Sequence, residues 1–342
     1  MEVCIAQISA YIFPIAAPSK QAYPVQCSEL APIAKDLVEN LFENKCGDTA
    51  HGALRLIFHD AMGLSPTEGG GGADGSILIF NATELTFEAN DGLDDVLADV
   101  GPFFWKHHRS ISPGDFVQLA GALSLIVCPG APRVKFFAGR PPPVAPSPNF
   151  LVPEPFNTTD QILERFDQVG FSPSEVIALL AAHSIAGADT VDTTIPGTPF
   201  DSTPSIFDTN IFIDVLLNGT IFPGTGNNSG EVMSAINGTM RLQSDFELAH
   251  DPRTACTWQK FATDQPSMAS QFGSALYKLS IIGQKLEDLT DCSELIPQAK
   301  PFKDVPQFPP GQFLRDIQQS CDSAKFPNLT TQPGPPLDVS PM

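Results

Sequence analysis

Three side chains capable of acid–base and electrostatic chemistry lie in one short apolar stretch, HGALRLIFHDAMG, at residues 51–63. Arg55 and His59 are four residues apart, so on a helix they share one face. Asp60 points about 100° away from His59. The pattern therefore predicts one site for the cation and the imidazole and another for the carboxylate. A buried histidine with a structural ion pair is the alternative interpretation.

Oxygen-bearing side chains follow two histidines at short spacing. After His59-Asp60 comes a glycine-rich loop that ends in Asp74-Gly75-Ser76, and after His183-Ser184 comes DSTPSIFD at residues 201–208. Carboxylates, hydroxyls and backbone carbonyls on tight loops are hard ligands suited to Ca²⁺. A flexible linker is the alternative for the glycine run, and no P-loop lysine follows it. The two sets favour a cofactor held between two calcium-braced halves.

The elements that must position these residues are predicted to be helices. Apolar residues recur at helical spacing in four segments, 30–44, 53–63, 112–127 and 256–286. Residues 172–175 form a capping box with proline at the first helical position, and they predict a helix that runs to His183. Strand signals are few and short, so we expect a mainly α fold.

The proline content of the chain indicates where its parts meet. Residues 139–157 are proline-rich, which indicates a connector between two halves at 23–150 and 151–326. Residues 327–342 are rich in proline and polar side chains, and we expect them to lie extended on the surface. Residues 1–22 resemble a signal peptide, although no Lys or Arg precedes their apolar run. That run is too short to span a bilayer as a helix.

Composition excludes some partners and indicates a compartment. The formal net charge of −20 argues against nucleic acid as a partner, and no later segment could span a membrane. None of the seven cysteines sits in a CxxC pair, so a thiolate zinc site is not expected. Scattered cysteines fit disulfides in an oxidising compartment. Secretion is also favoured by six glycosylation sequons, which begin at Asn81, Asn157, Asn218, Asn227, Asn237 and Asn328.

Six motifs occur in a fixed order: RLIFHD, GGGGADGS, CPGAPR, EVIALLAAHS, FDSTP and DPRTACTWQ. Together they resemble the secreted fungal haem peroxidases, class II of the plant, fungal and bacterial peroxidase superfamily, over about residues 26–330. The resemblance implies a two-domain helical fold with haem b between a distal and a proximal domain. It also implies a monomeric, extracellular enzyme that reduces hydrogen peroxide and carries two Ca²⁺ ions.

On the distal side, the resemblance assigns the chemistry to three residues. His59 matches the base that takes a proton from peroxide and returns it to the leaving oxygen. Arg55 matches the group that stabilises negative charge as the O–O bond breaks. Asn90 matches the residue that holds the distal imidazole in its acceptor tautomer.

On the proximal side, His183 matches the axial haem ligand, and Asp245 matches the carboxylate that accepts its other ring N–H. That bond makes the imidazole more basic. Phe58 and Phe200 match aromatic residues that line the haem.

The resemblance also implies ligand sets and disulfides. The distal calcium ligands match Asp60, Gly72, Asp74 and Ser76. The proximal ones match Ser184, Asp201, Thr203, Ile206 (through its backbone oxygen) and Asp208. The disulfide pairs match Cys27 with Cys292, Cys46 with Cys128, and Cys256 with Cys321. A further bridge usual in the family needs a second cysteine where this chain has Ser28, so Cys4 is left over.

The electron donor depends on a few further positions. Family members that oxidise bulky aromatics carry a surface tryptophan five residues before the proximal histidine, and here that residue is Ala178. Trp258 lies in an apolar helical setting and is predicted to be core. Manganese-oxidising members use three carboxylates, whose positions here are Asp48, Gly52 and Asp189. One ligand is therefore missing, and we expect a generic peroxidase that oxidises small phenolic and aromatic donors, with a possible role in lignin-related oxidation.

Three alternatives remain open from the sequence. The first is an atypical manganese peroxidase that uses Asp48 and Asp189. The second is a non-enzymatic haem- or calcium-binding protein, which would need neither Arg55 nor His59. The third is a non-haem metal hydrolase built on His59 and Asp60.

Overall fold

The computed structural model describes residues 25–342, so the predicted leader and Cys4 lie outside the described residues. Helices dominate this part of the chain, which confirms the mainly α prediction. The α-helices are α1 (Cys27–Asp36), α2 (Asp48–Ala61), α3 (Ser76–Ile79), α4 (Asn81–Glu84), α5 (Leu93–His107), α6 (Pro113–Ile126), α7 (Thr159–Gln168), α8 (Pro173–Leu179), α9 (Asn210–Asp214), α10 (Gln243–His250), α11 (Ala255–Phe261) and α12 (Gln265–Ser280).

Short helical turns and two-residue strands fill the connections. The turns are a π-helical η1 (Leu37–Leu41) and the 3₁₀ segments η2 (Glu88–Asn90), η3 (Leu180–Ile185), η4 (Leu286–Asp288), η5 (Ser293–Leu295) and η6 (Leu314–Asp316). The antiparallel strand pairs are β1 (Leu64–Ser65) with β2 (Gly69–Gly70), β3 (Phe137–Ala138) with β8 (Thr290–Asp291), β4 (Gly187–Ala188) with β5 (Thr198–Pro199), and β6 (Glu231–Val232) with β7 (Arg241–Leu242).

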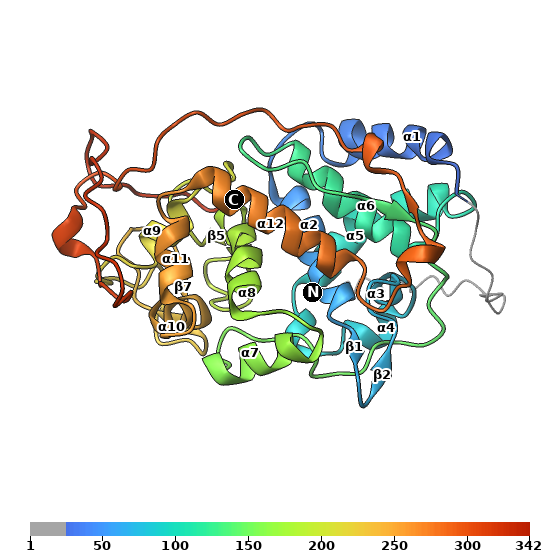
Figure 1. Ribbon diagram of the computed structural model, residues 1–342, viewed down its shortest axis with the longest axis horizontal. Helices are drawn as coiled ribbons and strands as arrows, with labels where there is room; N and C mark the ends of the chain where they lie inside the picture. The colour runs from blue at the N-terminus through green and yellow to red at the C-terminus, as the bar shows by residue number, and fades with distance from the viewer. Residues whose placement is uncertain (1–24) are drawn as a thin grey trace, which may run out of the picture.

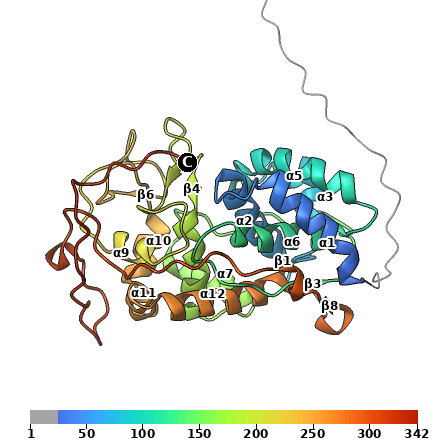
Figure 2. The ribbon, with the colours of Figure 1, turned by 90° about the horizontal axis from the view of Figure 1, so that it is seen from above.

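The helices form two groups that α12 spans. Helices α1 to α6 gather on one side of the molecule and α7 to α11 on the other, while α12 runs across both groups (Figures 1 and 2). Helix α2 packs on α5 and α6, and α12 packs on both α8 and α2. Because α12 contacts both groups of helices, it fixes the position of one group relative to the other. The predicted domain boundary near residue 150 stays a prediction.

Local sequence explains where the site-bearing helices begin and end. Ser112 caps α6 by accepting a hydrogen bond from the Asp115 N–H at 3.2 Å. The Glu175 carboxylate in the first turn of α8 accepts from the Ser172 N–H at 2.8 Å. The helix predicted to reach His183 is α-helical only to Leu179 and continues as the 3₁₀ segment η3. Tighter bonding of this kind is common where a helix ends, because it satisfies the last carbonyls.

The predicted helical pattern over 256–286 is in fact two helices, α11 and α12. Asp264 separates them and caps α12 by accepting from the Ser267 N–H at 3.0 Å. Trp258 on α11 is fully buried and donates to the Phe212 carbonyl at 3.0 Å, which confirms that it belongs to the core. None of the helices among residues 25–342 combines the length and apolar character needed to cross a membrane.

Three disulfides close long loops in the fold. They join Cys27 to Cys292, Cys46 to Cys128 and Cys256 to Cys321, the same pairs that the family resemblance implies. The first ties the start of α1 to the segment after α12.

The contact between α2 and α6 depends on the absence of a side chain at Gly121. A Cβ atom there would lie 2.3 Å from Cγ2 of Ile57 on α2. We predict that Gly121→Ala destabilises the protein by about 1–3 kcal/mol through overpacking. Gly101 on α5 is the matched control, because a Cβ there meets no atom within 4 Å. Gly101→Ala should be neutral or stabilising by up to about 1 kcal/mol. Urea denaturation measures both; equal effects would contradict the packing argument.

Candidate active site

A cavity of about 460 Å³ receives side chains from both helix groups. Arg55, Phe58 and His59 reach it from α2, while His183 and Phe200 reach it from the opposite group. Its walls are otherwise mostly apolar, with Leu54, Ile162, Val176, Leu179, Phe272 and Leu276 among them. The volume lies in the range of cofactor pockets, about 300–1,000 Å³. The predicted catalytic residues are therefore brought together around one enclosed space.

Hydrogen bonding fixes the tautomer of His59. Asn90 donates from Nδ2 to the Glu84 carbonyl at 2.9 Å, so its Oδ1 is the atom that lies 2.8 Å from His59 Nδ1. An amide oxygen can only accept, so Nδ1 must carry the proton and Nε2 must be the unprotonated acceptor. Burial, together with the nearby Arg55 charge, lowers the pKa of His59 to about 3. The ring is thus neutral and able to accept a proton over the whole physiological range.

Arg55 lies one helical turn from His59 and faces the same cavity. Its Nε–H points at His59 Nε2 at 3.2 Å, and its Nη2 donates to the Asp91 carbonyl at 2.9 Å. Burial lowers the pKa of the guanidinium, but Arg stays charged in proteins. The cavity therefore holds a fixed positive charge next to a neutral base, an arrangement suited to negative charge that develops on a small bound molecule.

The second imidazole is held by a carboxylate. His183 Nδ1 lies 2.8 Å from Oδ2 of Asp245, which is fully buried on α10. The carboxylate accepts from Nδ1–H and leaves Nε2 as the free ligand atom. The ring of Phe200 packs against His183 at 5.1 Å, and that of Phe58 packs edge-on to His59 at 5.6 Å. Apolar walls and one oriented imidazole fit a haem with an axial histidine.

Asp60 turns away from the cavity into a buried pocket of oxygens. Its Oδ2 accepts from the Gly75 N–H at 3.0 Å, while Oδ1 is buried without a protein partner. Burial and the Asp74 charge raise the pKa of Asp60 well above its usual range, and burial raises that of Asp74 to about 6. Ser76 is fully buried and Gly72 has a left-handed backbone (φ 67°). Two buried, mutually repelling carboxylates with a spare oxygen fit a hard cation such as Ca²⁺.

Glu84 joins this pocket to the distal histidine, a link that sequence reasoning missed. Its backbone carbonyl accepts from Asn90, and its buried carboxylate accepts from the Ser147 N–H at 2.9 Å. Ser147 Oγ in turn lies 2.9 Å from Ser76 Oγ. The hydrogen-bond chain therefore runs from the predicted cation ligands to His59. No local motif marks it, because Ser147 is distant in sequence.

The second predicted ligand set also comes together. Asp201 is fully buried; its Oδ1 accepts from the Thr203 N–H at 2.8 Å and its Oδ2 has no protein partner. Burial and the Asp208 charge raise the pKa of Asp201 well above its usual range, and burial raises that of Asp208 to about 7. Ser184 is fully buried directly after His183, and Ile206 lies in the same loop as the two aspartates.

Asp214 adds a third carboxylate here that the sequence did not single out. Its Oδ2 accepts from the Ser202 N–H at 2.9 Å, its Oδ1 is unpartnered, and burial raises its pKa to about 7. A cation would balance this charge.

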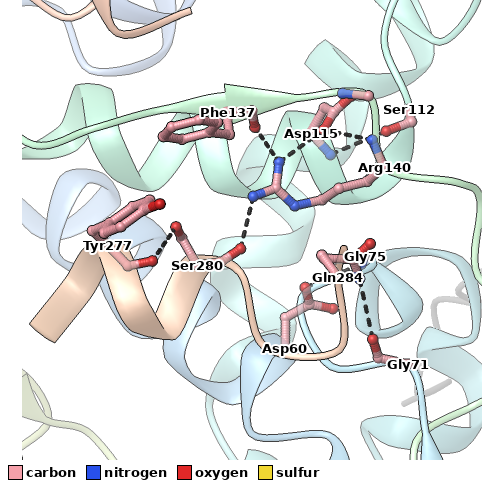
Figure 3. Close-up of polar contacts among 11 residues, drawn as sticks. Asp60, Gly71, Gly75, Ser112, Asp115, Phe137, Arg140, Tyr277, Ser280 and Gln284 are labelled. Carbon is pink, nitrogen blue, oxygen red and sulfur yellow. Dashed lines mark hydrogen bonds and ion pairs between the residues drawn. The ribbon is translucent and has the colours of Figure 1, made fainter. Parts of the chain in front are cut away.

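The glycine loop next to Asp60 is tied to α12 by a small polar network (Figure 3). The Ala73 N–H donates to the Ile282 carbonyl at 3.0 Å, and Gln284 Nε2 donates to the Gly71 carbonyl at 3.2 Å. Nearby, the fully buried Arg140 donates to Asp115 on α6 at 2.8 Å and to the Ser280 carbonyl at the end of α12 at 2.7 Å. These contacts fix the cation pocket relative to the helix that spans both groups.

Asp48 and Asp189 form a small group of carboxylates beside the cavity, which Asp189 lines. Burial and the charge of Asp189 raise the pKa of Asp48, with smaller contributions from Asp99 and Asp95. Asp189 lines the cavity, and its negative charge partly offsets the lowering of the Arg55 pKa by burial. The structure thus brings the two predicted acidic positions into one cluster. Gly52 beside them has a packing role: a Cβ there would lie 2.9 Å from two atoms of Val96 on α5.

A further part of the cavity lining is also acidic and partly aromatic. Glu154, Phe156, Glu88 and Asp91 line it, and burial, followed by the charges of Glu88 and Asp91, raises the pKa of Glu154. Ala178, five residues before His183, is 2% exposed.

Two other metal arrangements do not fit the described residues. His59 and Asp60 hydrogen bond to different partners, Asn90 and Gly75, so they do not form one metal centre. Cys46, His51 and Cys128 place three donor atoms close together, but the two sulfurs are joined in a disulfide. The hydrolase alternative is therefore not supported.

Comparisons with known proteins place the chain in a family context. The peroxidase family matches residues 34–264, and the fungal peroxidase extension region matches residues 267–342. The chain is 48% identical to manganese peroxidase 3 of Phlebia radiata, over 93% of this chain and 89% of that protein. It is 47% identical to versatile peroxidase VPS1 of Pleurotus eryngii (92% and 87% covered) and 45% identical to ligninase B of Phanerodontia chrysosporium (92% and 87% covered).

Chelation should destabilise the protein, and more strongly at higher pH. Without a cation, the raised pKa values of Asp74 (about 6) and Asp208 (about 7) mean that the folded state binds protons more tightly than the unfolded state. Ion-free stability therefore falls as pH rises from about 4 to about 7. We expect Tm to fall by about 5–10 °C per ion lost at pH 8, and by less at pH 5.

The protein would be stripped once at pH 8, exchanged into metal-free buffer at each pH, and melted in a calorimeter. Excess Ca²⁺ should restore Tm. An unchanged Tm at both pH values would contradict the cation sites.

Proposed function

Because this chain belongs to the fungal class II peroxidases, a family of hydrogen-peroxide-dependent oxidoreductases, we propose that it oxidises small donors one electron at a time at the mouth of its cavity. The observation that carries the proposal is the pair of oriented imidazoles. His59 and His183 line one cavity, and each is bonded through Nδ1 so that its Nε2 is left without a proton. Neither a binding protein nor a hydrolase requires this arrangement.

A haem bound in the cavity would supply the redox chemistry and would be held through Nε2 of His183. Asp245 orients His183 by accepting from its Nδ1–H. From the other helix group, His59 Nε2 would accept a proton from peroxide and return it to the departing oxygen. Arg55 stabilises the negative charge that develops on that oxygen. Asn90 keeps His59 in the tautomer that permits both transfers.

Small phenols are the donor class that we put first. The rim residues Pro153, Pro155 and Phe156 offer apolar contact beside the carboxylate of Glu154. A flat aromatic ring with a hydroxyl suits such a surface. With Ala178 buried at the position of the surface tryptophan, oxidation of bulky non-phenolic aromatics is not expected.

Mn²⁺ is the second candidate donor, favoured by one specific observation. Asp189 lines the cavity and lies close enough to Asp48 for its charge to raise the pKa of Asp48. Carboxylate oxygens are ligands that Mn²⁺ prefers. Val96 occupies the space that a third side chain at position 52 would need, so any Mn²⁺ site would rest on two carboxylates of this set.

Two Ca²⁺ ions and an extracellular location complete the proposal. The unpartnered oxygens of Asp60 and Asp201 support the ions, and three disulfides support an oxidising compartment.

A donor panel tests the proposal. Haem-loaded enzyme and peroxide would be given a phenol, Mn²⁺ or a non-phenolic aromatic alcohol in separate steady-state assays. We expect efficient turnover of the phenol, weaker turnover of Mn²⁺ and none of the alcohol. His59→Leu should lower all turnover by about 10²–10⁴-fold.

Asp189→Ala should weaken Mn²⁺ oxidation alone. Asp322→Ala, at an exposed residue beside the Cys256–Cys321 disulfide, is the matched control. Micromolar saturation by Mn²⁺ that Asp189→Ala abolishes would make Mn²⁺ the main donor. Turnover of the alcohol would contradict the proposal.

A further inference from the structure

One rim of the cavity mouth is a loop between two short strands. Residues Asp189, Thr190 and Val191 line the cavity, and the loop closes where Ala188 of β4 pairs with Thr198 of β5. The loop also approaches the other helix group, because a Cβ at Gly92 would lie 3.3 Å from Thr190 and 3.5 Å from Arg55. Its position therefore affects both the opening and the surroundings of Arg55.

The rim carboxylate has a fixed orientation within this loop. Asp189 is exposed, but its side chain is held in one orientation because the Gly197 N–H donates to its Oδ1 at 2.8 Å. The Gly197 carbonyl in turn accepts from the Met342 N–H at 2.9 Å. The carboxylate can thus hold its place only while the loop holds its shape.

A second aspartate inside the loop, Asp192, is 3% exposed and accepts four hydrogen bonds. Two come from within the loop: Thr194 donates its N–H at 3.0 Å and its hydroxyl at 2.6 Å. The other two come from a separate segment: Thr225 donates its N–H at 2.7 Å and its hydroxyl at 2.8 Å. All four donors are neutral, and together they hold the pKa of Asp192 well below its usual range.

Two of the four bonds connect the rim to Thr225, which does not line the cavity. Hydrogen bonds to an ionised acceptor are stronger than neutral ones, so a buried carboxylate with four donors is a firm anchor. Gly224 permits the approach, since a Cβ there would lie 2.4 Å from Asp192 Oδ2. One side chain therefore shapes the loop internally and also binds it to residues 224–225.

We propose that Asp192 is a positioning residue for donor oxidation: it anchors the loop of residues 189–198 to Thr225 and so fixes Asp189 at the cavity mouth. This inference rests on the proposed function, because the proposed function is what assigns donor binding to the cavity mouth. Asp192 touches neither the cavity nor the reacting atoms; it acts through Asp189. Loosening the anchor should weaken donor binding and leave the reaction with peroxide intact.

Asp192→Asn tests this by keeping the side-chain volume while removing one acceptor oxygen, which costs two of the four bonds. Thr225→Val removes only the hydroxyl bond to the neighbouring segment. Asp291→Asn is the matched control: Asp291 accepts from the Ser293 N–H at 2.9 Å and from its hydroxyl in the same kind of turn, but on β8, outside the cavity lining.

Three readouts separate positioning from a merely structural role. Steady-state kinetics would be run with Mn²⁺, the donor whose oxidation depends on Asp189, and with the phenol for comparison. Stopped-flow kinetics measure the peroxide step, and hydrogen exchange measures the protection of residues 189–198. For Asp192→Asn we expect the KM for Mn²⁺ to rise at least about fivefold, as for loss of a net hydrogen bond, and the KM for the phenol to change by less. The kcat and the peroxide rate constant should stay within about twofold, with protection lost in this loop alone.

Unchanged KM and unchanged loop protection in Asp192→Asn would overturn the proposal, and so would exchange that rises throughout the protein. If Asp192→Asn does not fold, the same criteria apply to Thr225→Val. A wild type that oxidises neither donor would instead refute the proposed function. In that case, the protection of residues 189–198 against hydrogen exchange in Asp192→Asn and Thr225→Val decides whether Asp192 anchors the loop.

Discussion

Two hydrogen bonds of 2.8 Å determine what this cavity can do. One joins His59 Nδ1 to Asn90 and the other joins His183 Nδ1 to Asp245. Each places the ring proton on the side away from the cavity, so both Nε2 lone pairs face inward from opposite walls. One imidazole is left to accept a proton and the other to bind a metal. The same chemical device therefore serves two different roles, and the helices, loops and cations around it keep the two rings in place.

The support for each ring reaches it through neighbouring residues. Asp60 follows His59 directly and Ser184 follows His183, so an ion bound on either side braces the backbone that carries the imidazole. On the distal side, Glu84 adds a second connection, since it holds Asn90 through its carbonyl and the cation pocket through its carboxylate. Loss of an ion would thus disturb the tautomer as well as the fold. Between the two sides, α12 contacts both helix groups.

The sequence was enough to predict the parts that are local. The spacing of Arg55, His59 and Asp60 predicted that the first two share one site and that Asp60 faces another. Short-range periodicity predicted a mainly helical fold. Features that depend on contacts between distant segments were missed. Val96 packs on Gly52 only because α5 and α2 approach closely, and Asp192 meets Thr225 only in the folded chain. The turn from α-helix to 3₁₀ helix before His183 was also missed, since periodicity does not separate the two.

The reaction with peroxide over a range of pH tests the central claim most directly, namely that a neutral His59 with an unprotonated Nε2 is the base. Stopped-flow rate constants for wild type should stay level from pH 7 to about 4 and fall near pH 3, because burial and Arg55 lower the pKa of His59 to about 3. Asn90→Asp keeps an acceptor at Nδ1 but adds a negative charge, so the fall should move up by about one pH unit or more at a similar plateau rate. A wild-type fall near pH 6.5, the ordinary range of histidine, or a profile that Asn90→Asp leaves unchanged, would contradict the account.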